Sequence, residues 1–252
     1  MQLFGSGREH AALRVSVLSD RGRVHANNED ACLADEEQGL FAVADGVGGQ
    51  PAGDVAAQIT VQHLPRLIDQ ALSQPRKGPD TAIKQAIVEL SDLVQAEARS
   101  DPELSGMATT VVMLLIVDHV AYVAHVGDSR AYVARDRQLY RLTDDHSLAA
   151  ELVQSGVITA EEANTHPFAH SITQAIGLPN TPQPTVQQFE LAAGDRLLLC
   201  SDGLTDMVPE GDIAAILTAD ADVDATSRAL IDAANAAGGK DNISVVVIDY
   251  VP

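Results

Sequence analysis

Four strand-like apolar runs of this sequence carry an aspartate at one end, and three of these aspartates stand beside a glycine. They are Asp45 in FAVADGVGG, Asp128 in VAHVGDSR, Asp202 in LLLCSDGL and Asp241 in GGKDNISVVVI. Carboxylates crowded together repel one another and destabilise a fold unless a cation neutralises them. Oxygen ligands with no Cys or His cluster beside them favour Mg²⁺ or Mn²⁺. A fold that gathers these run ends therefore predicts a carboxylate-bridged site for several metal ions.

Size and charge restrict the class of protein. The chain has 252 residues, 46% of them hydrophobic, so we expect one domain over residues 13–252 behind a loose tail of residues 1–12. A formal net charge of -20 argues against nucleic acid or an anionic membrane as a partner. Cys32 and Cys200 give no disulfide framework. Without a signal peptide or a long apolar run, we expect a cytoplasmic monomer with no membrane insertion.

The order of the expected elements is not the alternation of a parallel α/β fold. Apolar and alternating runs predict strands at 13–20, 39–45, 108–118, 119–128, 129–136, 184–191, 195–202 and 242–251. Helical spacing predicts helices at 53–72, 81–99, 147–155, 209–218 and 224–237, with a capping box at Thr159. We expect an α+β fold in which antiparallel sheets carry helices on their outer faces.

Turn chemistry adds detail to this outline. The three central strands are expected to follow one another as antiparallel neighbours through tight turns at Asp118-His119 and Gly127-Asp128. The polar, irregular stretch at about 156–170 is expected to form a mobile lid.

An Asp-Gly pair alone is more typical of a turn than of a metal ligand. The run DGVGGQPAGD is more informative, because its glycines let the backbone approach a ligand closely. The same arrangement recurs at Asp202-Gly203 and, with Asn, at Asp241-Asn242. The recurrence favours the metal-ligand interpretation.

Together these motifs resemble the metal-dependent PPM (PP2C-type) Ser/Thr protein phosphatases in their compact bacterial form. The matching pieces, in the family order, are SDRGRVHANNED (19–30), FAVADGVGGQPAG (41–53), GMATTVV (106–112), HVGDSRAYV (125–133), LTDDHSL (142–148), LLLCSDGLTDMV (197–208) and GGKDNISVVVI (238–248). The resemblance implies a β-sandwich of two antiparallel sheets flanked by antiparallel helix pairs, a four-layer αββα arrangement. It also implies a metal cleft at one end and a flap, which agrees with the lid expected at about 156–170.

The resemblance further implies which residues hold the metals. The two core Mn²⁺ or Mg²⁺ ions would be bound by Asp45, the carbonyl of Gly46, Asp202 and Asp241. Asp128 would hold a possible third, weaker ion together with Asp202, while Glu29 and Asp30 would act through metal-bound water. A water shared by two ions can attack phosphorus directly, so no protein nucleophile is needed.

The substrate side departs from the family pattern. Many bacterial members have an Arg that grips the substrate phosphate where this chain has His25, and a neutral imidazole is a weaker phosphate ligand. Arg23, two residues back, could reach in instead. Asn242 and the flap residue His166 are further candidates for substrate contact.

Two more positions leave the general acid unassigned. Gln50 stands where bacterial relatives often have His, and Val47 stands where animal relatives carry a candidate general-acid His. We expect His146 to orient the loop after the DD pair. The acidic stretch DADVDATSRALI lacks the Gly and Glu of a calcium loop, having Ala225 and Ile231 there, so we interpret DADVD as a helix N-cap.

The leading hypothesis is a metal-dependent phosphatase that removes phosphate from Ser and Thr in phosphoprotein substrates and so reverses a bacterial Ser/Thr kinase. An alternative keeps the fold as a catalytically weak, phosphoprotein-binding regulatory module, and His25 and Gln50 favour it. A small-molecule phosphatase is a third possibility that the residues alone leave open.

Overall fold

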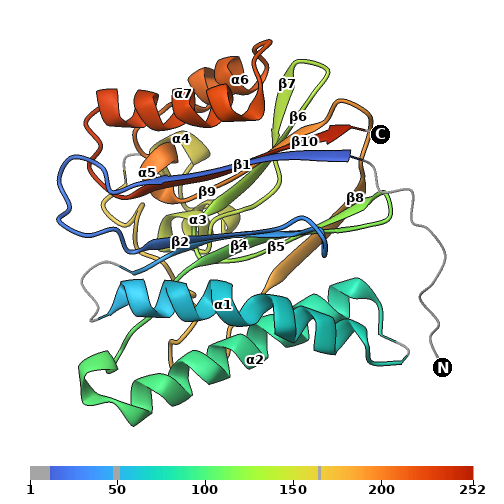
Figure 1. The fold of residues 1–252 in the computed structure, drawn as a ribbon. Helices are drawn as coiled ribbons and strands as arrows, with labels where there is room; N and C mark the ends of the chain where they lie inside the picture. Colours follow the sequence, from blue (N-terminus) through green and yellow to red (C-terminus); the bar gives the residue numbers. More distant parts are fainter. Residues whose placement is uncertain (1–11, 48–51, 76, 164–165, 252) are drawn as a thin grey trace.

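The computed structural model describes residues 12–47, 52–75, 77–163 and 166–251. It forms two five-stranded antiparallel sheets that face each other, with α1 and α2 outside one sheet and α6 and α7 outside the other (Figure 1). The expected four-layer α+β sandwich is therefore confirmed. Apart from Ala12, where the first strand begins, the expected tail lies outside the described residues.

The first sheet has the order β1-β10-β9-β6-β7 and the second the order β2-β3-β4-β5-β8. The strands are β1 (Ala12–Asp20), β2 (Asp30–Asp35), β3 (Leu40–Asp45), β4 (Val111–Val117), β5 (Val120–Val126), β6 (Arg130–Arg135), β7 (Gln138–Arg141), β8 (Thr185–Glu190), β9 (Arg196–Cys200) and β10 (Ile243–Val251). The helices are α1 (Gly53–Leu72), α2 (Pro79–Ser100), α3 (Leu148–Gln154), α4 (Ala160–Ala163), α5 (Asp202–Thr205), α6 (Glu210–Leu217) and α7 (Val223–Ala236), with a 3₁₀ turn at Pro102–Leu104. None of the helices in these ranges is long and apolar enough to cross a membrane.

Strand β3 shows why the sandwich has three apolar layers. Successive side chains of a strand point to opposite faces of its sheet. Leu40 and Ala42 pack under α1 and α2, whereas Phe41 and Val43 pack against the other sheet, and all four are fully buried. A strand that is covered on both faces reads as a continuous apolar run, as LFAVA does.

One expected connection is wrong. The turn at Gly127-Asp128 does not join neighbouring strands, because β5 lies in the second sheet and β6 in the first. The chain crosses between the sheets here, and Gly127 adopts a φ of 106° with Thr110 side-chain atoms against it. An apolar run buried on both faces does not reveal whether the next strand pairs with it or crosses over. The turn at Asp118-His119 does join the paired strands β4 and β5.

The structure also contains elements that periodicity did not predict. These are β2, the short edge strand β7 and the single turn of α5. Strand β2 matters for the site, because its first residue pairs with the last residue of β3.

The N-cap of α7 supplies a stability prediction. Asp222 caps this helix by accepting a hydrogen bond from the Ala225 N–H at 2.7 Å, as expected for DADVD. We expect Asp222→Ala to lower the free energy of unfolding by about 1 kcal/mol, the usual cost of losing a side-chain cap. Urea unfolding measures this, with Asp224→Ala in the first turn of the same helix as the matched control. An equal loss in both variants would contradict a capping role.

Candidate active site

Sheet register brings the predicted carboxylates to one end of the sandwich. Strand β3 ends at Asp45, which pairs with Asp30 at the start of β2. Strands β9 and β10 are antiparallel neighbours, so Asp202 after the end of β9 lies near Asp241 before the start of β10. The start of β6 pairs with the end of β9, which places Asp128 at the same end. Five carboxylates from both sheets therefore meet in one place.

Their electrostatics show the cost of this arrangement. Asp30 and Asp128 are buried, and the surrounding protein raises the pKa of each to about 6. Removal from water, and then the negative charges of Asp30, Asp202 and Asp128, raise the pKa of Asp45 well above its usual value. Removal from water and then the charge of Asp128 do the same to Asp202. A bound cation would reverse both effects by favouring the ionised forms.

The donor atoms suit a hard divalent cation. Asp30 Oδ2 accepts a hydrogen bond from Ser201 Oγ at 2.8 Å, but its buried Oδ1 meets no hydrogen-bond donor among the described residues. At Gly46 an added Cβ would lie 2.5 Å from the carbonyl carbon of Gly53 and 2.8 Å from Glu29 O. Only glycine lets the start of α1 approach the end of β3 so closely, which leaves the Gly46 backbone beside the carboxylates. A set made only of oxygen donors fits Mn²⁺ or Mg²⁺.

Asn242 fixes the loop that precedes β2. Its Oδ1 accepts from the Glu29 N–H at 2.7 Å, and its Nδ2 donates to the carbonyls of Arg21 and Asn27, both at 3.0 Å. The side chain is buried, so the structure gives it a positioning role towards Glu29. Its contact with a substrate stays a prediction.

His25 and Arg23 lie on the same loop. His25 Nε2 is 3.4 Å from Asp241 Oδ1, and 42% of the His25 side chain is exposed. The Arg23 N–H donates to the carbonyl of Gly239 at 2.7 Å, and the residue is exposed. His25 therefore borders one of the carboxylates, and Arg23 lies on the same loop; contact of either residue with a phosphate stays a prediction.

His146 was expected to orient the loop after the DD pair, and the structure shows it bound to the loop of Asp128. Its Nδ1 accepts from the Gly127 N–H at 3.3 Å, and its own N–H donates to the Gly127 carbonyl at 2.9 Å. The ring stacks on His125 with centroids 4.4 Å apart. Burial lowers the pKa of His146 to about 4, so the ring stays neutral and can accept this hydrogen bond at neutral pH.

The expected flap contains α4, and its capping box is confirmed by reciprocal hydrogen bonds between Thr159 and Glu162. His166 Nδ1 accepts from the Phe168 N–H at 3.3 Å and makes no contact with the carboxylates among the hydrogen bonds and ion pairs of the described chain. Substrate contact by His166 stays a prediction, and so does movement of the flap.

Sequence reasoning missed two residues beside the carboxylate cluster. His170, at the end of the flap, has its Nδ1 3.0 Å from Asp206 Oδ2, and both groups come within 4.8 Å of an Asp202 oxygen. The spacing of Asp206, four residues after Asp202, was a usable signal, because such residues share one face of a helical turn. Nothing local marked His170.

Val47 is half-buried and its N–H donates to the Ala108 carbonyl at 3.0 Å, whereas Gln50 lies outside the described residues.

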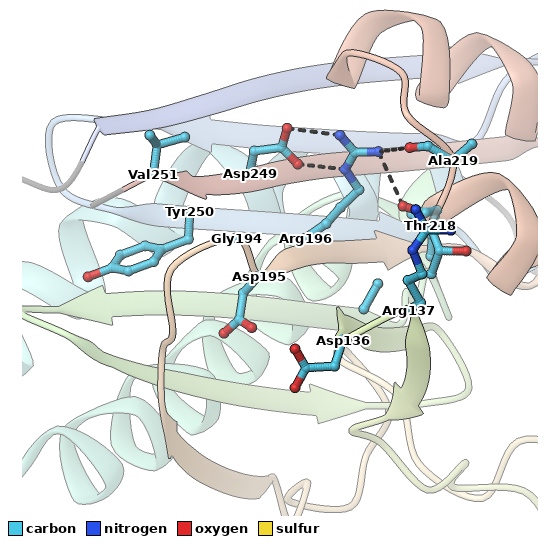
Figure 2. A pocket seen from close by; sticks show the side chains of 12 residues that line it. Asp136, Arg137, Gly194, Asp195, Arg196, Thr218, Ala219, Asp249, Tyr250 and Val251 are labelled. Atoms are coloured by element: carbon cyan, nitrogen blue, oxygen red, sulfur yellow. Dashed lines mark hydrogen bonds and ion pairs between the residues drawn. The ribbon is translucent and has the colours of Figure 1, made fainter.

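A hollow of about 270 Å³ lies away from the carboxylates, at the opposite ends of β6, β9 and β10. Its charged side chains include Arg196, which forms a bidentate ion pair with Asp249 (Figure 2). The ion pair of Arg196 joins β9 to β10 and has a structural role. A hollow lined by a guanidinium does not suit a metal ion.

Comparison with known proteins decides the family. The sequence profile described as Protein phosphatase 2C matches residues 21–239. The chain belongs to the protein phosphatase 2C family. This family member is 38% identical over 239 residues to the serine/threonine protein phosphatase PstP of Mycobacterium tuberculosis (strain ATCC 25618 / H37Rv), covering 95% of this chain and 45% of that relative. It is 35% identical to the serine/threonine phosphatase stp of Listeria monocytogenes, covering 94% of this chain and 96% of that relative.

Solved structures agree with this assignment. The catalytic domain of M. tuberculosis PstP in complex with two manganese ions matches with a TM-score of 0.80 and 37% identity, over 95% of this chain and 99% of that one. Serine/threonine phosphatase Stp1 from Staphylococcus aureus matches with a TM-score of 0.86 and 30% identity, over 98% and 99% of the two chains. The phosphatase 2C fold and the family resemblance are thereby confirmed.

Proposed function

We propose that this phosphatase 2C family member hydrolyses phosphoserine and phosphothreonine in proteins with the help of divalent metal ions. The observation that carries the proposal is the convergence of five carboxylates, one with an unsatisfied buried oxygen, at the strand ends of a fold shared with Ser/Thr phosphatases. The binding-module alternative is not favoured, because this costly carboxylate cluster is intact.

Two Mn²⁺ or Mg²⁺ ions would be held by Asp45, the Gly46 carbonyl, Asp202 and Asp241. When bound, two such ions lower the pKa of a shared water and clamp an in-line displacement at phosphorus. Asp128 would share a third ion with Asp202.

Other residues of the chain would bind and orient. Glu29 and Asp30 would act through metal-bound water by accepting its hydrogen bonds, and the unpaired Oδ1 of Asp30 supports this role. His25, or Arg23 in its place, would bind the phosphate oxygens. Val47 has no ionisable group and does not serve as the general acid.

The cysteines do not offer a competing mechanism. Burial raises the pKa of both Cys32 and Cys200 to about 12, so neither supplies a thiolate near neutral pH. Attack by water is thus the better fit. We further infer a cytoplasmic monomer that acts against a Ser/Thr kinase, as a phosphoprotein phosphatase requires a kinase to make its substrate.

The deciding experiment is hydrolysis of p-nitrophenyl phosphate and of a phosphothreonine peptide with Mn²⁺, Mg²⁺ or EDTA. We expect turnover of both substrates with metal and none with EDTA, and the ratio of the two rates tests whether protein is the substrate class. A folded protein that binds Mn²⁺ yet hydrolyses neither substrate would instead support the regulatory module.

A further inference from the structure

Three exposed cationic residues lie on loops that meet at the predicted metal ligand Asp241. They come from two loops and are Arg21, Arg23 and Lys240, a set that we call the basic rim. None of the three forms an ion pair within the part of the chain that the structure describes. The feature is unusual here, because the whole protein has only 16 basic residues against 36 acidic ones.

The two loops are locked together by their backbones. The Arg23 N–H donates to the Gly239 carbonyl at 2.7 Å, and the Asn242 side chain donates to the Arg21 carbonyl at 3.0 Å. A Cβ on Gly22 would lie 2.2 Å from Asp241 O, so the contact admits only glycine there. In Figure 1 the loop between β1 and β2 lies at the same end of the molecule as the turn into β10. The backbone that carries the rim residues is therefore fixed beside the site.

Nearby carboxylates are already engaged. Asp20 Oδ1 accepts from the Gly22 N–H at 2.9 Å and from Asn235 Nδ2 at 3.2 Å. Asp241 Oδ1 accepts from the Asn242 N–H at 2.8 Å, and under the proposed function this carboxylate also binds a metal ion. Arg21 Nη1 donates to the Ala26 carbonyl at 3.2 Å, which leaves its charge uncompensated. With the metal ions bound, the positive charge of the rim would face the solvent without a carboxylate partner.

The flap side of the site has the opposite character. Between Arg141 and Arg196 the sequence contains no Lys or Arg, whereas it carries acidic residues at Glu151, Glu161 and Glu162. A substrate chain that met both regions would therefore meet positive charge on one side and negative charge on the other. Charges arranged in this way fix the direction of a bound partner more than they raise its affinity.

We propose that the basic rim binds acidic side chains on one side of the phosphorylated residue, so that this enzyme prefers phosphoprotein segments with one acidic flank. The proposal rests on the proposed phosphatase function and names the substrate class of that site. A protein of net charge -20 would otherwise repel an acidic segment. A local group of positive charges would offset this repulsion where the segment binds.

The test uses phosphothreonine peptides of equal length with a neutral flank, an acidic N-terminal flank, an acidic C-terminal flank or a basic flank. With Mn²⁺ present, we expect one of the two acidic peptides to have a KM about threefold below that of the neutral peptide, since exposed charge pairs contribute modestly. The basic peptide should have the highest KM. Raising the salt to roughly 0.5 M should remove the preference, because exposed charges are then screened. Equal KM values for all four peptides at low salt would overturn the proposal.

Charge reversal locates the effect. The double variant Arg21→Glu, Lys240→Glu should lose the preference for the acidic peptide or reverse it, when each peptide rate is divided by the p-nitrophenyl phosphate rate of the same variant. Lys84→Glu on the exposed face of α2 is the matched control and should keep the preference. A preference that survives in the double variant, or is lost equally in the control, would contradict the rim.

A binding measurement separates this proposal from the phosphatase function. Fluorescein-labelled versions of the same peptides, followed by anisotropy, report the preference whether or not the peptides are hydrolysed. Preferential binding without turnover would overturn the proposed function and retain the rim. Turnover without any preference in binding or KM would do the reverse.

Discussion

Asp45→Asn is expected to lower metal-dependent turnover of a phosphothreonine peptide by about a hundredfold to a thousandfold, the scale seen when a charge-stabilising group is removed from an active site. The amide keeps the size of the side chain but loses the negative charge that would bridge two ions. The backbone of residue 45 cannot shift far, because Thr110 holds it on both sides. The backbone N–H of Asp45 donates to Thr110 Oγ1 at 3.2 Å, and its backbone carbonyl accepts from the Thr110 N–H at 2.8 Å. The measurement is kcat at saturating Mn²⁺.

The same variant should not unfold. Removing one of several mutually repelling carboxylates relieves repulsion in the metal-free protein, so its melting temperature in EDTA should equal or exceed that of the wild type. Asp212→Asn on α6, an exposed acidic residue, is the control for a generic loss of charge. Near wild-type turnover in Asp45→Asn would contradict the assignment of Asp45 as a ligand of the two metal ions.

The helices and the layered fold follow from local sequence signals. Helix α1 occupies the expected residues 53–72 because its apolar positions recur at helical spacing and form one buried face. Strand β10 is likewise marked by its long apolar run, which lies between β1 and β9 in the middle of a sheet. These patterns are local, so a single sequence suffices to find them.

The missed elements are those whose stability comes from tertiary contacts. Strand β2 is a short edge strand, DACLAD, with only four apolar residues between Asp30 and Asp35. Strand β7 has only four residues, and α5 is a single turn. The crossing between β5 and β6 was misread because burial on both faces makes a hairpin and a crossover look alike in sequence.

The candidate site divides in the same way. The aspartates were recognisable because each stands next to an apolar run and often beside glycine. His170 and Asp206 approach each other only after the flap folds back to α5, a contact between positions far apart in the chain that no local pattern encodes. The basic rim also depends on two loops far apart in the chain.

The affinity for Mn²⁺ is expected to fall by about tenfold or more between pH 7.5 and pH 5.5. Metal ligands must be deprotonated, and each proton displaced weakens binding about tenfold per pH unit below the relevant pKa. The pKa values of Asp30 and Asp128 are raised to about 6, and burial raises those of Asp45 and Asp202 well above the usual range. Isothermal titration in buffers of different ionisation enthalpy would count the protons released.

The sign of the stability change follows from the same shifts. A carboxylate whose pKa is higher in the folded than in the unfolded state binds more protons when folded, so the metal-free protein loses this contribution to stability as pH rises through about 6. His146 and His125 act in the opposite sense, because burial lowers their pKa values and acid must then charge them. The histidines contribute equally to the melting temperature with and without Mn²⁺. Their contribution therefore drops out of the rise in melting temperature that Mn²⁺ causes. That rise should therefore shrink steadily from pH 7.5 to pH 5.5, and a rise independent of pH would mean that these carboxylates do not bind the metal.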